Sequence, residues 1–439
     1  MEAAKLRTLM TDGPSSDPSV RAAQKASETA LVAATPALDA PPASEPRVQR
    51  PRRAAPADIV RPTRAEVFLD ALRHNLRVVR RHAGGAKVWG VLKADAYGHG
   101  APAVARTLER GGIDAFCVAL LEEGIELREA GIRAPILVMG GYYGGAHAEV
   151  LARKLVPVVY DLGQVEAFAR LARSGDVPEP IDVHLKIDSG MSRLGVLPRE
   201  LSAFVTKLRD FPEIRVTGLM THLAQADAES EAATAEQLRT FDDATALLAS
   251  LGIVPEVRHA ANTAAVMRGT GQLDAVRVGI GLFGSAPVLG PEPMPVTSGR
   301  DLRPAMRVRT EIVAVRDIEP GDAVGYGALF RASRPTRIAT IAMGYADGLS
   351  RQLSNRGAVL VRGKRATIVG AVSMDMAMID VTDHPGVAVR DEVVVLGSQD
   401  GVLGRDVITS EEVASQSDSI AWEVLTSVSR RVPRFYREP

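Results

Sequence analysis

The sequence predicts an α/β fold in which a (β/α)8 barrel of the TIM type is followed by a mostly β domain. Short apolar segments alternate with amphipathic ones from about residue 64 to 300, and after residue 300 the pattern changes to short strands broken by turn residues. The first sixty or so residues show neither pattern and are rich in Ala, Pro and Ser. We therefore predict a disordered tail over residues 1–60, a barrel over 64–300 and a β-rich domain over 301–439.

The predicted barrel has eight strands, and a helical pattern such as that of residues 164–171 separates each strand from the next. The strands are expected at 88–93, 115–119, 135–139, 156–160, 181–187, 214–221, 255–260 and 275–283. Eight βα units in this length indicate a closed parallel barrel rather than an open doubly wound sheet. A further strand at 64–69 precedes the count, and we assign it to the sheet of the second domain. Asp70 is then expected to be the N-cap of a helix over residues 71–82.

The second domain is predicted from its turns, which fall at residues 319–322, 355–357 and 362–364. Short alternating segments between these turns indicate strands. Only residues 409–430 have a helical pattern, and we expect one helix there.

Composition limits the classes of partner. The chain has 439 residues, of which 46% are hydrophobic, and a formal net charge of zero. It has no dense basic run beside aromatic residues, which argues against nucleic acid or an anionic membrane as partner. No stretch approaches the roughly 20 apolar residues of a membrane helix. We therefore expect a small-molecule partner.

The cysteine content and the tail suggest a cytoplasmic protein. Cys117 is the only cysteine and lies in an apolar stretch, so we expect a buried structural thiol and no intramolecular disulfide. This fits a reducing compartment. The most apolar run of the tail, residues 30–34, is too short and too far from the start to be the apolar region of a secretory signal.

The first predicted barrel strand ends on a lysine, which is followed by small residues. Lys93 in this position could bond covalently to a carbonyl cofactor such as pyridoxal phosphate, and Tyr97 offers a hydroxyl to a phosphate group. On this spacing alone, a solvated lysine at the end of a strand is the more frequent case.

The carboxyl ends of the other strands also carry polar residues, and active sites of such barrels gather at those ends. The residues are Lys93, Lys186, Asp188, Arg193, Thr221, His222, His259, Asn262, Thr263, Arg277, Gly279 and Gly281. A single histidine among them could be a hydrogen-bonded core residue, but their convergence indicates a site. Gly279 and Gly281 flank Ile280 after the eighth strand, where barrels often bind phosphate through backbone N–H groups.

From residue 64 to 439 the chain resembles the alanine racemase family, pyridoxal-phosphate enzymes with a barrel and a β domain. Eight segments carry the resemblance in order: VLKADAYGHG (91–100), KIDSGMSRLG (186–195), MTH (220–222), HAANT (259–263), RVGIG (277–281), GYG (325–327), GYADG (344–348) and SMD (373–375). The resemblance implies interconversion of L-alanine and D-alanine, with D-alanine supplied for peptidoglycan.

Racemisation removes the α-proton from one face of an amino acid and returns a proton to the other, so it needs two bases. The resemblance implies that Lys93 holds pyridoxal phosphate and is one base, and that Tyr326 is the other. In the family this tyrosine comes from the partner subunit, which implies a homodimer with shared active sites. A phenol titrates near 10, so its surroundings must favour the phenolate.

The resemblance assigns further residues to the cofactor. Arg277 would face the pyridine nitrogen and keep it unprotonated, which would shorten the life of the carbanion and favour racemisation over transamination. His222 would orient Arg277, and His259 and Asn262 would belong to the same site. The phosphate would be held by Tyr97, Thr263, Gly279 and Ile280, with Thr263 in place of the serine that is common in the family.

Other residues would bind the substrate or shape its path. Arg193 would contact the cofactor's phenolic oxygen and the substrate carboxylate, and Met374 would offer its backbone N–H to that carboxylate. Tyr345 would narrow the entrance. Lys186 matches a lysine that in relatives can carry a carbamate, and a plain lysine is the alternative. No metal site is predicted.

One position departs from the family. A tyrosine near the C terminus usually reaches the cofactor phosphate, and this chain has Trp422 there. The indole N–H could donate to the phosphate, or the ring could simply pack against the predicted helix.

Two other functions compete with alanine racemisation. A broad-specificity racemase acting on serine, lysine or arginine shares the fold and both bases. Such enzymes are often exported, and the tail here does not resemble a secretory signal, so alanine is the preferred substrate. A non-catalytic pyridoxal-phosphate carrier also has a barrel with an equivalent lysine, but that class lacks the β domain and Tyr326.

Overall fold

The computed structural model describes residues 60–140, 146–175, 180–285 and 301–438. The predicted disordered tail, up to residue 59, lies outside the described residues.

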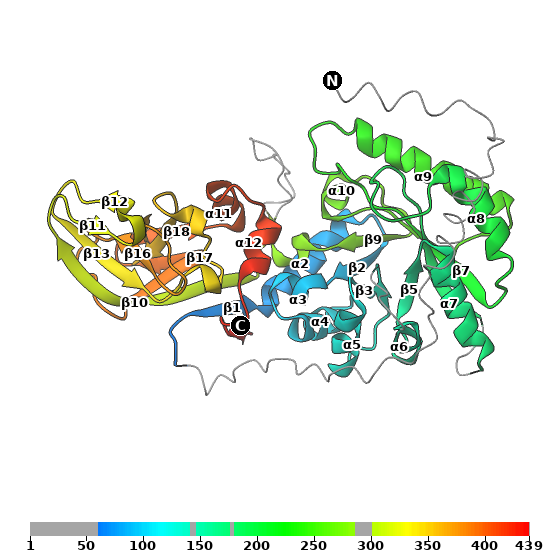
Figure 1. The fold of residues 1–439 in the computed structure, drawn as a ribbon, viewed down its shortest axis with the longest axis horizontal. Helices are drawn as coiled ribbons and strands as arrows, with labels where there is room; N and C mark the ends of the chain where they lie inside the picture. Colours follow the sequence, from blue (N-terminus) through cyan, green and yellow to red (C-terminus); the bar gives the residue numbers. More distant parts are fainter. Residues whose placement is uncertain (1–59, 141–145, 176–179, 286–300, 439) are drawn as a thin grey trace, which may run out of the picture. The chain divides into compact units, whose positions relative to one another are not determined.

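Within the described residues, eight parallel strands close into a barrel, which confirms the predicted count (Figure 1). The strands are β2 (Lys87–Val91), β3 (Ala115–Val118), β4 (Ile136–Val138), β5 (Val156–Val159), β6 (Ile181–Lys186), β7 (Ile214–Met220), β8 (Val257–His259) and β9 (Ala275–Val278). The barrel closes where β2 pairs with β9 and Trp89 lies opposite Arg277. Because all strands are parallel, their carboxyl ends share one face of the barrel.

Helices surround the barrel strands in Figure 1. They are α2 (Leu69–His82), α4 (Ala101–Arg110), α5 (Leu121–Glu129), α6 (His147–Ala152), α7 (Leu162–Arg173), α8 (Leu201–Leu208), α9 (Ala232–Ser250) and α10 (Thr263–Arg268). In α7, Val165, Phe168 and Ala172 recur at helical spacing and are buried, and the Asp161 side chain caps the helix by accepting the N–H of Gly163 at 2.8 Å.

The predicted N-cap of α2 is wrong. The helix begins at Leu69, directly after β1, and Phe68 is its N-cap, so Asp70 lies within the first turn. An acidic side chain is favourable there because it faces the positive end of the helix dipole, which explains why the sequence pattern resembled a cap.

The second domain is a nine-stranded sheet in the described chain, in the order β18, β17, β14, β15, β16, β13, β10, β1, β19. Its strands are β1 (Arg64–Phe68), β10 (Met306–Ile318), β13 (Thr336–Ile341), β14 (Ala358–Val361), β15 (Lys364–Val369), β16 (Ala377–Asp380), β17 (Glu392–Gly401), β18 (Gly404–Ile408) and β19 (Arg434–Arg437). A separate ribbon pairs β11 (Ala323–Val324) with β12 (Phe330–Arg331). The early strand β1 lies between β10 and β19, so the sheet joins the beginning and the end of the described chain.

The turn at 362–364 shows why the sequence marks hairpins well. Arg362 and Gly363 both have positive φ between β14 and β15, as a tight hairpin requires. A Cβ on Gly363 would lie 1.9 Å from the carbonyl oxygen of Gly404, so glycine is required there.

The single helix predicted over 409–430 is wrong, because the structure has two. They are α11 (Ser410–Gln416) and α12 (Ala421–Ser427), and Asp418 between them has a φ of 51°. The break falls in a run of serine and aspartate, whose side chains compete for backbone hydrogen bonds. This break positions α12, which carries Trp422.

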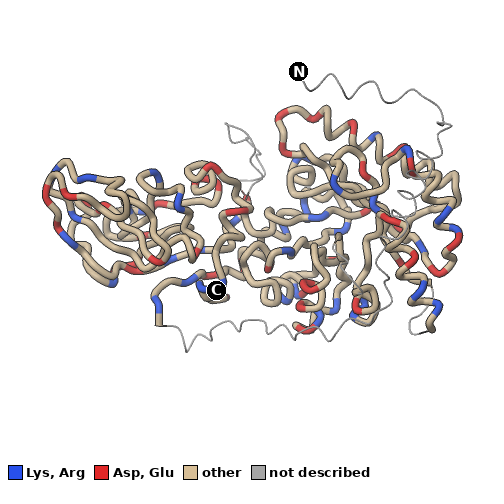
Figure 2. The backbone as a smooth tube through the Cα atoms, in the orientation of Figure 1, with Lys and Arg blue, Asp and Glu red and all other residues tan. Residues whose placement is uncertain are grey.

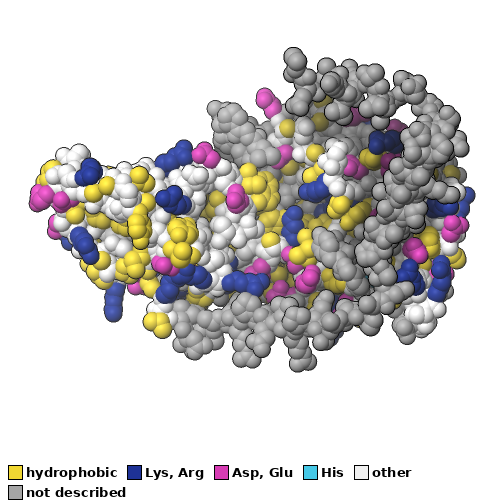
Figure 3. All heavy atoms as spheres, viewed as in Figure 1, with side chains coloured by type: hydrophobic (Ala, Val, Ile, Leu, Met, Phe, Trp, Pro, Cys, Tyr) yellow, Lys and Arg dark blue, Asp and Glu magenta, His cyan; other side chains and the backbone are white. Residues whose placement is uncertain are grey.

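Charged residues of both signs are distributed along the chain in the barrel and the second domain (Figure 2). On the face in Figure 3 their side chains lie among hydrophobic and neutral ones. None of the helices in the described ranges is long and apolar enough to cross a membrane. Cys117 is fully buried in β3 and burial raises the pKa of its thiol to about 12, which confirms the predicted structural role.

Candidate functional site

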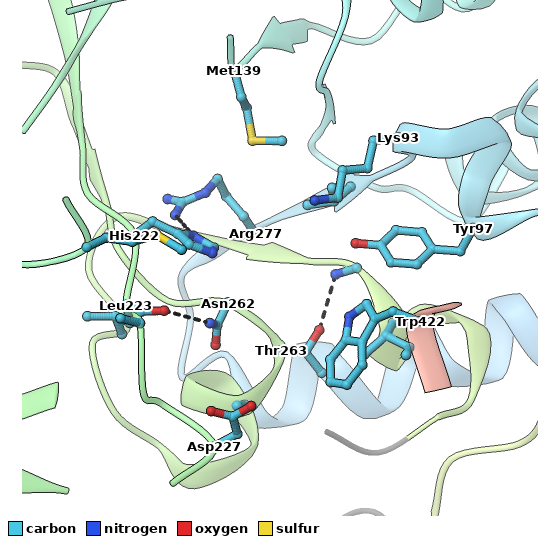
Figure 4. A pocket seen from close by; sticks show the side chains of 16 residues that line it. Lys93, Tyr97, Met139, His222, Leu223, Asp227, Asn262, Thr263, Arg277 and Trp422 are labelled. Atoms are coloured by element: carbon cyan, nitrogen blue, oxygen red, sulfur yellow. Dashed lines mark hydrogen bonds between the residues drawn. The ribbon is translucent and has the colours of Figure 1, made fainter. Parts of the chain in front are cut away.

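A cavity of about 250 Å³ lies at the carboxyl ends of the barrel strands (Figure 4). It brings together nine of the residues predicted to bind the cofactor: Lys93, Tyr97, His222, Asn262, Thr263, Arg277, Gly279, Ile280 and Trp422. These residues come from the segments after β2, β7 and β8, from β9 and the turn after it, and from α12. The predicted residues Arg193, His259, Tyr326, Tyr345 and Met374 do not line it.

Lys93 begins an unusual turn. Strand β2 ends at Val91, two residues earlier than predicted, and Lys93 opens the short helical turn α3 (Lys93–Tyr97). Ala94, Asp95, Ala96 and Tyr97 all have φ between 52° and 57°, so the turn is left-handed. Left-handed backbone costs roughly 1–2 kcal/mol per residue, which the rest of the fold must offset.

The environment of Lys93 changes its ionisation. The side chain is open to the cavity, yet the surrounding protein removes enough of its hydration to lower the pKa of the ammonium group. The positive charge of Arg193 lowers this pKa further, while the negative charge of Glu123 opposes the shift. A larger fraction of neutral amine is therefore present near neutrality than in free lysine.

The far end of the turn forms a cradle of hydroxyl and N–H groups. Tyr97 is buried against Phe283, with ring centres 5.1 Å apart, and burial raises the pKa of its phenol. The hydroxyl oxygen of Thr263 accepts the backbone N–H groups of Gly279 at 3.2 Å and Gly281 at 3.4 Å. A Cβ on Gly279 would lie 2.2 Å from the Tyr97 hydroxyl oxygen, so this close approach requires glycine.

Two neighbours complete this side of the cavity. In Figure 4 the indole of Trp422 lies beside Thr263. The Asn262 side chain caps α10, since its oxygen accepts the N–H of Ala265 at 3.1 Å, and its amino group donates to the Leu223 carbonyl at 3.4 Å. Asn262 is thus bonded to the chain at both ends of its amide.

Arg277 is 3% exposed and donates to both predicted histidines. Its Nη1 donates to Nδ1 of His259 at 2.7 Å, and its Nη2 donates to Nδ1 of His222 at 3.3 Å and to the Thr221 carbonyl at 2.7 Å. Burial lowers the pKa of Arg277 to about 10, which still leaves it protonated at neutral pH.

These bonds fix the state of the histidines. A guanidinium has no acceptor, so Nδ1 of each ring must be unprotonated. Burial and the charge of Arg277 lower the pKa of His222 to about 3, and they lower that of His259 well below its usual value. Both rings are therefore neutral, with their proton on Nε2. Nε2 of His259 then donates to Nδ1 of His184 at 2.9 Å, and burial lowers the pKa of His184 to about 4.

Sequence reasoning missed His184. It lies on β6 two residues before Lys186, so strand alternation places both side chains on the same face of the barrel. That spacing is a usable signal.

Lys186 is the last residue of β6, and Asp188 lies two residues after it. Lys186 is buried, and desolvation with the charges of Arg193 and Arg277 lowers its pKa to about 8. Burial opposes ionisation of Asp188, but backbone N–H groups outweigh it and lower its pKa. One carboxylate oxygen accepts the N–H groups of residues 190, 191 and 192 at 3.0, 2.8 and 3.0 Å, which fixes the loop leading to Arg193.

The three predicted residues of the second domain lie away from the cavity lining. Tyr326 is 76% exposed, in a short 3₁₀ turn (Tyr326–Ala328) between β11 and β12. Tyr345 and Met374 are also exposed and lie on adjacent segments, because the Tyr345 N–H donates to the Ser373 carbonyl at 3.0 Å. Buried Asp347, on the Tyr345 segment, accepts two hydrogen bonds from Arg61, at 2.9 and 2.8 Å, which tie this segment to the beginning of the described chain.

The cavity also has residues that the sequence analysis did not single out. They are Val91, Met139, Met191, Leu223, Ala224, Asp227 and Ala264. Met139 points its sulfur into the cavity in Figure 4. An apolar residue at the end of a barrel strand looks like core in the sequence, so no local signal separates it from its neighbours.

Comparison with known proteins gives consistent matches. The family model "Alanine racemase, N-terminal domain" matches residues 67–287, and "Alanine racemase, C-terminal domain" matches residues 305–436. An alanine racemase of Sorangium cellulosum is 59% identical over 387 residues, which are 87% of this chain and 100% of that protein.

Solved structures agree. An alanine racemase of Clostridium difficile superposes with a TM-score of 0.78 at 35% identity and covers 87% of this chain and 97% of its own. The crystal structure of an alanine racemase from Bacillus anthracis with bound L-Ala-P has a TM-score of 0.78 at 32% identity, over 87% of this chain and 96% of its own.

Proposed function

This chain belongs to the alanine racemase family, and we propose that it interconverts L-alanine and D-alanine with pyridoxal phosphate held at Lys93. One observation carries the proposal: a single cavity gathers a lysine of lowered pKa, a buried arginine and a cradle of hydroxyl and N–H groups. The B. anthracis relative was solved with L-Ala-P, a ligand derived from alanine by its name, which supports an alanine-sized substrate.

The residues present fit this cofactor. The approach of Gly279 to Tyr97 leaves no room for a Cβ, as expected where the backbone must come close to a phosphate. Tyr97, Thr263, Gly279 and Ile280 would hold the phosphate, and Lys93 would bond to the carbonyl carbon. When bound, pyridoxal phosphate supplies a carbonyl for the substrate amino group and a ring that withdraws electrons from the α-carbon.

Arg277 sets the limit of that withdrawal. Its pKa of about 10 keeps the guanidinium charged at neutral pH, and a guanidinium can only donate. It would therefore leave the cofactor's ring nitrogen without a proton, and the ring would be a weaker electron acceptor. His222 and His259 fix the plane of the guanidinium through their Nδ1 atoms. This arrangement favours return of the proton to the α-carbon over side reactions.

Two bases would move the proton. While Nζ of Lys93 is not bonded to the cofactor, its lowered pKa would favour the neutral amine, which could accept the α-proton on one face. We propose that the phenol oxygen of Tyr326 from a second copy of this chain serves the other face. Its 76% exposure in one chain is compatible with entry into the site of a partner, and the enzyme proposed here is a homodimer with shared sites.

Arg193 would hold the substrate carboxylate, together with the backbone N–H of Met374, and Tyr345 would narrow the entrance. Lys186 has a pKa of about 8, so an appreciable fraction is the neutral amine that carbamate formation requires. We propose that a carbamate on Lys186 positions Arg193, with the plain lysine as the alternative. The enzyme would act in the cytoplasm and would supply D-alanine for peptidoglycan.

The test is racemisation of a panel of amino acids by the purified enzyme loaded with pyridoxal phosphate, followed by chiral chromatography. We expect alanine to react fastest, with serine, lysine and arginine far slower. A preference for one of those three would support the broad-specificity alternative, and no turnover of alanine by enzyme with bound cofactor would refute the proposal. Borohydride reduction should fix the cofactor to the wild-type protein but not to Lys93→Ala. Attachment to Lys93→Ala after reduction would show that another residue bonds to the cofactor.

A further inference from the structure

Glu123, in the first turn of α5, accepts three backbone N–H groups with its two carboxylate oxygens. Oε1 accepts the N–H of Ala94 at 2.6 Å. Oε2 accepts the N–H groups of Ala119 at 2.8 Å and Leu120 at 3.1 Å. The three N–H groups belong to the segments that follow β2 and β3, which are neighbours in the barrel. One side chain thus ties two segments together at the face where the cavity lies.

The bond to Ala94 holds the turn that carries Lys93. Ala94 directly follows Lys93 and is the first residue of the left-handed stretch. The N–H groups in the first turn of a helix have no carbonyl partner within the helix, so this one needs an acceptor from outside. Glu123 is that acceptor. Later in the turn, the N–H of Ala96 donates to the Leu92 carbonyl at 2.9 Å and that of Gly98 to the Ala94 carbonyl at 3.0 Å.

The strain of the turn makes outside contacts necessary. Alanine and aspartate do not favour left-handed backbone when they stand in a run, so the sequence of the turn does not maintain it alone. Its far end is held by Arg434, whose Nε donates to the Gly98 carbonyl at 2.8 Å. Its near end, where Lys93 lies, is held by Glu123.

We propose that Glu123 is a positioning residue for Lys93: by fixing the first peptide of the turn, it sets the direction in which Nζ enters the cavity. This inference rests on the role of Lys93 in the proposed function. The charge of the carboxylate acts in the same place, because Glu123 raises the pKa of Lys93 against the effect of burial. Removing that charge should therefore move the pKa of Lys93 further down.

Glu123→Gln is a sharp test because it keeps the shape of the side chain. A glutamine amide has one accepting oxygen and one donating NH2 group. Both carboxylate oxygens of Glu123 face N–H donors, so either orientation of the glutamine places donor against donor on one side. The matched control is Glu109→Gln in α4. A single oxygen of Glu109 accepts the N–H groups of Arg133 and Ala134, both at 2.8 Å, and a glutamine oxygen can keep both bonds.

The first measurement is hydrogen exchange of the full-length protein without cofactor, followed in the peptide covering residues 93–98. We expect exchange to be about tenfold faster in Glu123→Gln and unchanged in Glu109→Gln, with similar melting temperatures. Unchanged exchange in Glu123→Gln would overturn the proposal. This measurement needs no turnover, so it remains informative if the wild-type enzyme fails to racemise alanine.

The second measurement uses the enzyme loaded with pyridoxal phosphate. For Glu123→Gln we expect kcat for alanine to fall about tenfold or more with little change in KM, and the acid limb of the pH profile to move to lower pH. Replacing a residue that only supports the barrel would neither lower kcat at nearly constant KM nor move the pH profile. Faster exchange combined with wild-type kcat would refute positioning of Lys93. If Glu123→Gln does not fold, Glu123→Asp keeps the charge but is too short to bridge both segments. The same outcomes for exchange and kcat then apply, while the acid limb of the pH profile should stay in place because the charge is retained.

Discussion

Replacing Gly279 with alanine tests whether the cradle beside Tyr97 binds the phosphate group. The added Cβ would lie 2.2 Å from the Tyr97 hydroxyl oxygen and 2.9 Å from the ring carbon that bears it. Ordinary carbon–oxygen contact needs about 3.4 Å, so the hydroxyl or the Gly279 backbone must move by roughly 1 Å.

The size of the effect follows from how firmly Tyr97 is held. It ends the left-handed turn, and its ring packs against Phe283, so the ring has little freedom to withdraw. Overpacking in such a place costs about 1–3 kcal/mol. If that cost falls on the form that binds the cofactor, affinity should drop by roughly 5-fold to 150-fold.

The assay is titration of pyridoxal phosphate into cofactor-free protein, with Tyr97→Phe as the partner variant. Removing the hydroxyl takes away the 2.2 Å clash but leaves the ring contact, so Gly279→Ala should cost less in the Tyr97→Phe background than in the wild type. Equal costs in both backgrounds, or wild-type affinity in Gly279→Ala, would show that the close approach does not shape the phosphate site.

Three further variants test other parts of the structure. Tyr326→Phe should bind the cofactor normally yet lose most racemisation in both directions, and normal turnover measured by chiral chromatography would exclude it as a base. His184→Ala should lower the melting temperature by removing the acceptor of the buried His259 N–H, at a cost of about 1–3 kcal/mol, and should lower cofactor affinity if His259 then no longer fixes Arg277. Burial raises the pKa of Glu66, but hydrogen bonds from two arginines outweigh it and lower the pKa. Ionised Glu66 therefore stabilises the fold above about pH 4.5, its unfolded pKa, and this stabilisation is lost as the pH falls through the folded pKa. The difference in melting temperature between wild type and Glu66→Gln should shrink as the pH falls below about 4.5. A difference that stays constant would contradict this assignment.

The barrel could be predicted from the sequence because each strand is a short apolar run bounded by polar residues. Residues 115–119 and 135–139, for example, contain the observed strands β3 and β4. The end of β2 could not be placed, because the left-handed turn after Val91 arises from tertiary contacts. Neither alanine nor aspartate favours a run of left-handed residues, so the sequence has no local signal for this turn.

Cavity residues with ionisable side chains at strand ends could be predicted from the sequence, whereas residues without such a signal could not. Lysine and arginine at strand ends drew attention, and Lys93 and Arg277 do share the cavity. Glu123 did not, because a glutamate in the first turn of a helix usually faces solvent or caps the helix. Only the fold shows that the Glu123 carboxylate reaches the peptide that follows Lys93.

The pKa values and protonation states of the site residues depend on the fold and could not be predicted from the sequence. Lys93, Lys186, Arg193 and Arg277 bring positive charge to one end of the barrel, where burial together with these charges lowers the pKa of both lysines and keeps His222 neutral. The same excess of positive charge attracts anionic groups such as phosphate and carboxylate. Each bound anion offsets part of that charge and so raises the pKa of Lys93. Binding and basicity are therefore coupled: a ligand held by these cations makes the neutral form of Lys93 a stronger base, which the proton transfer proposed for this residue would use.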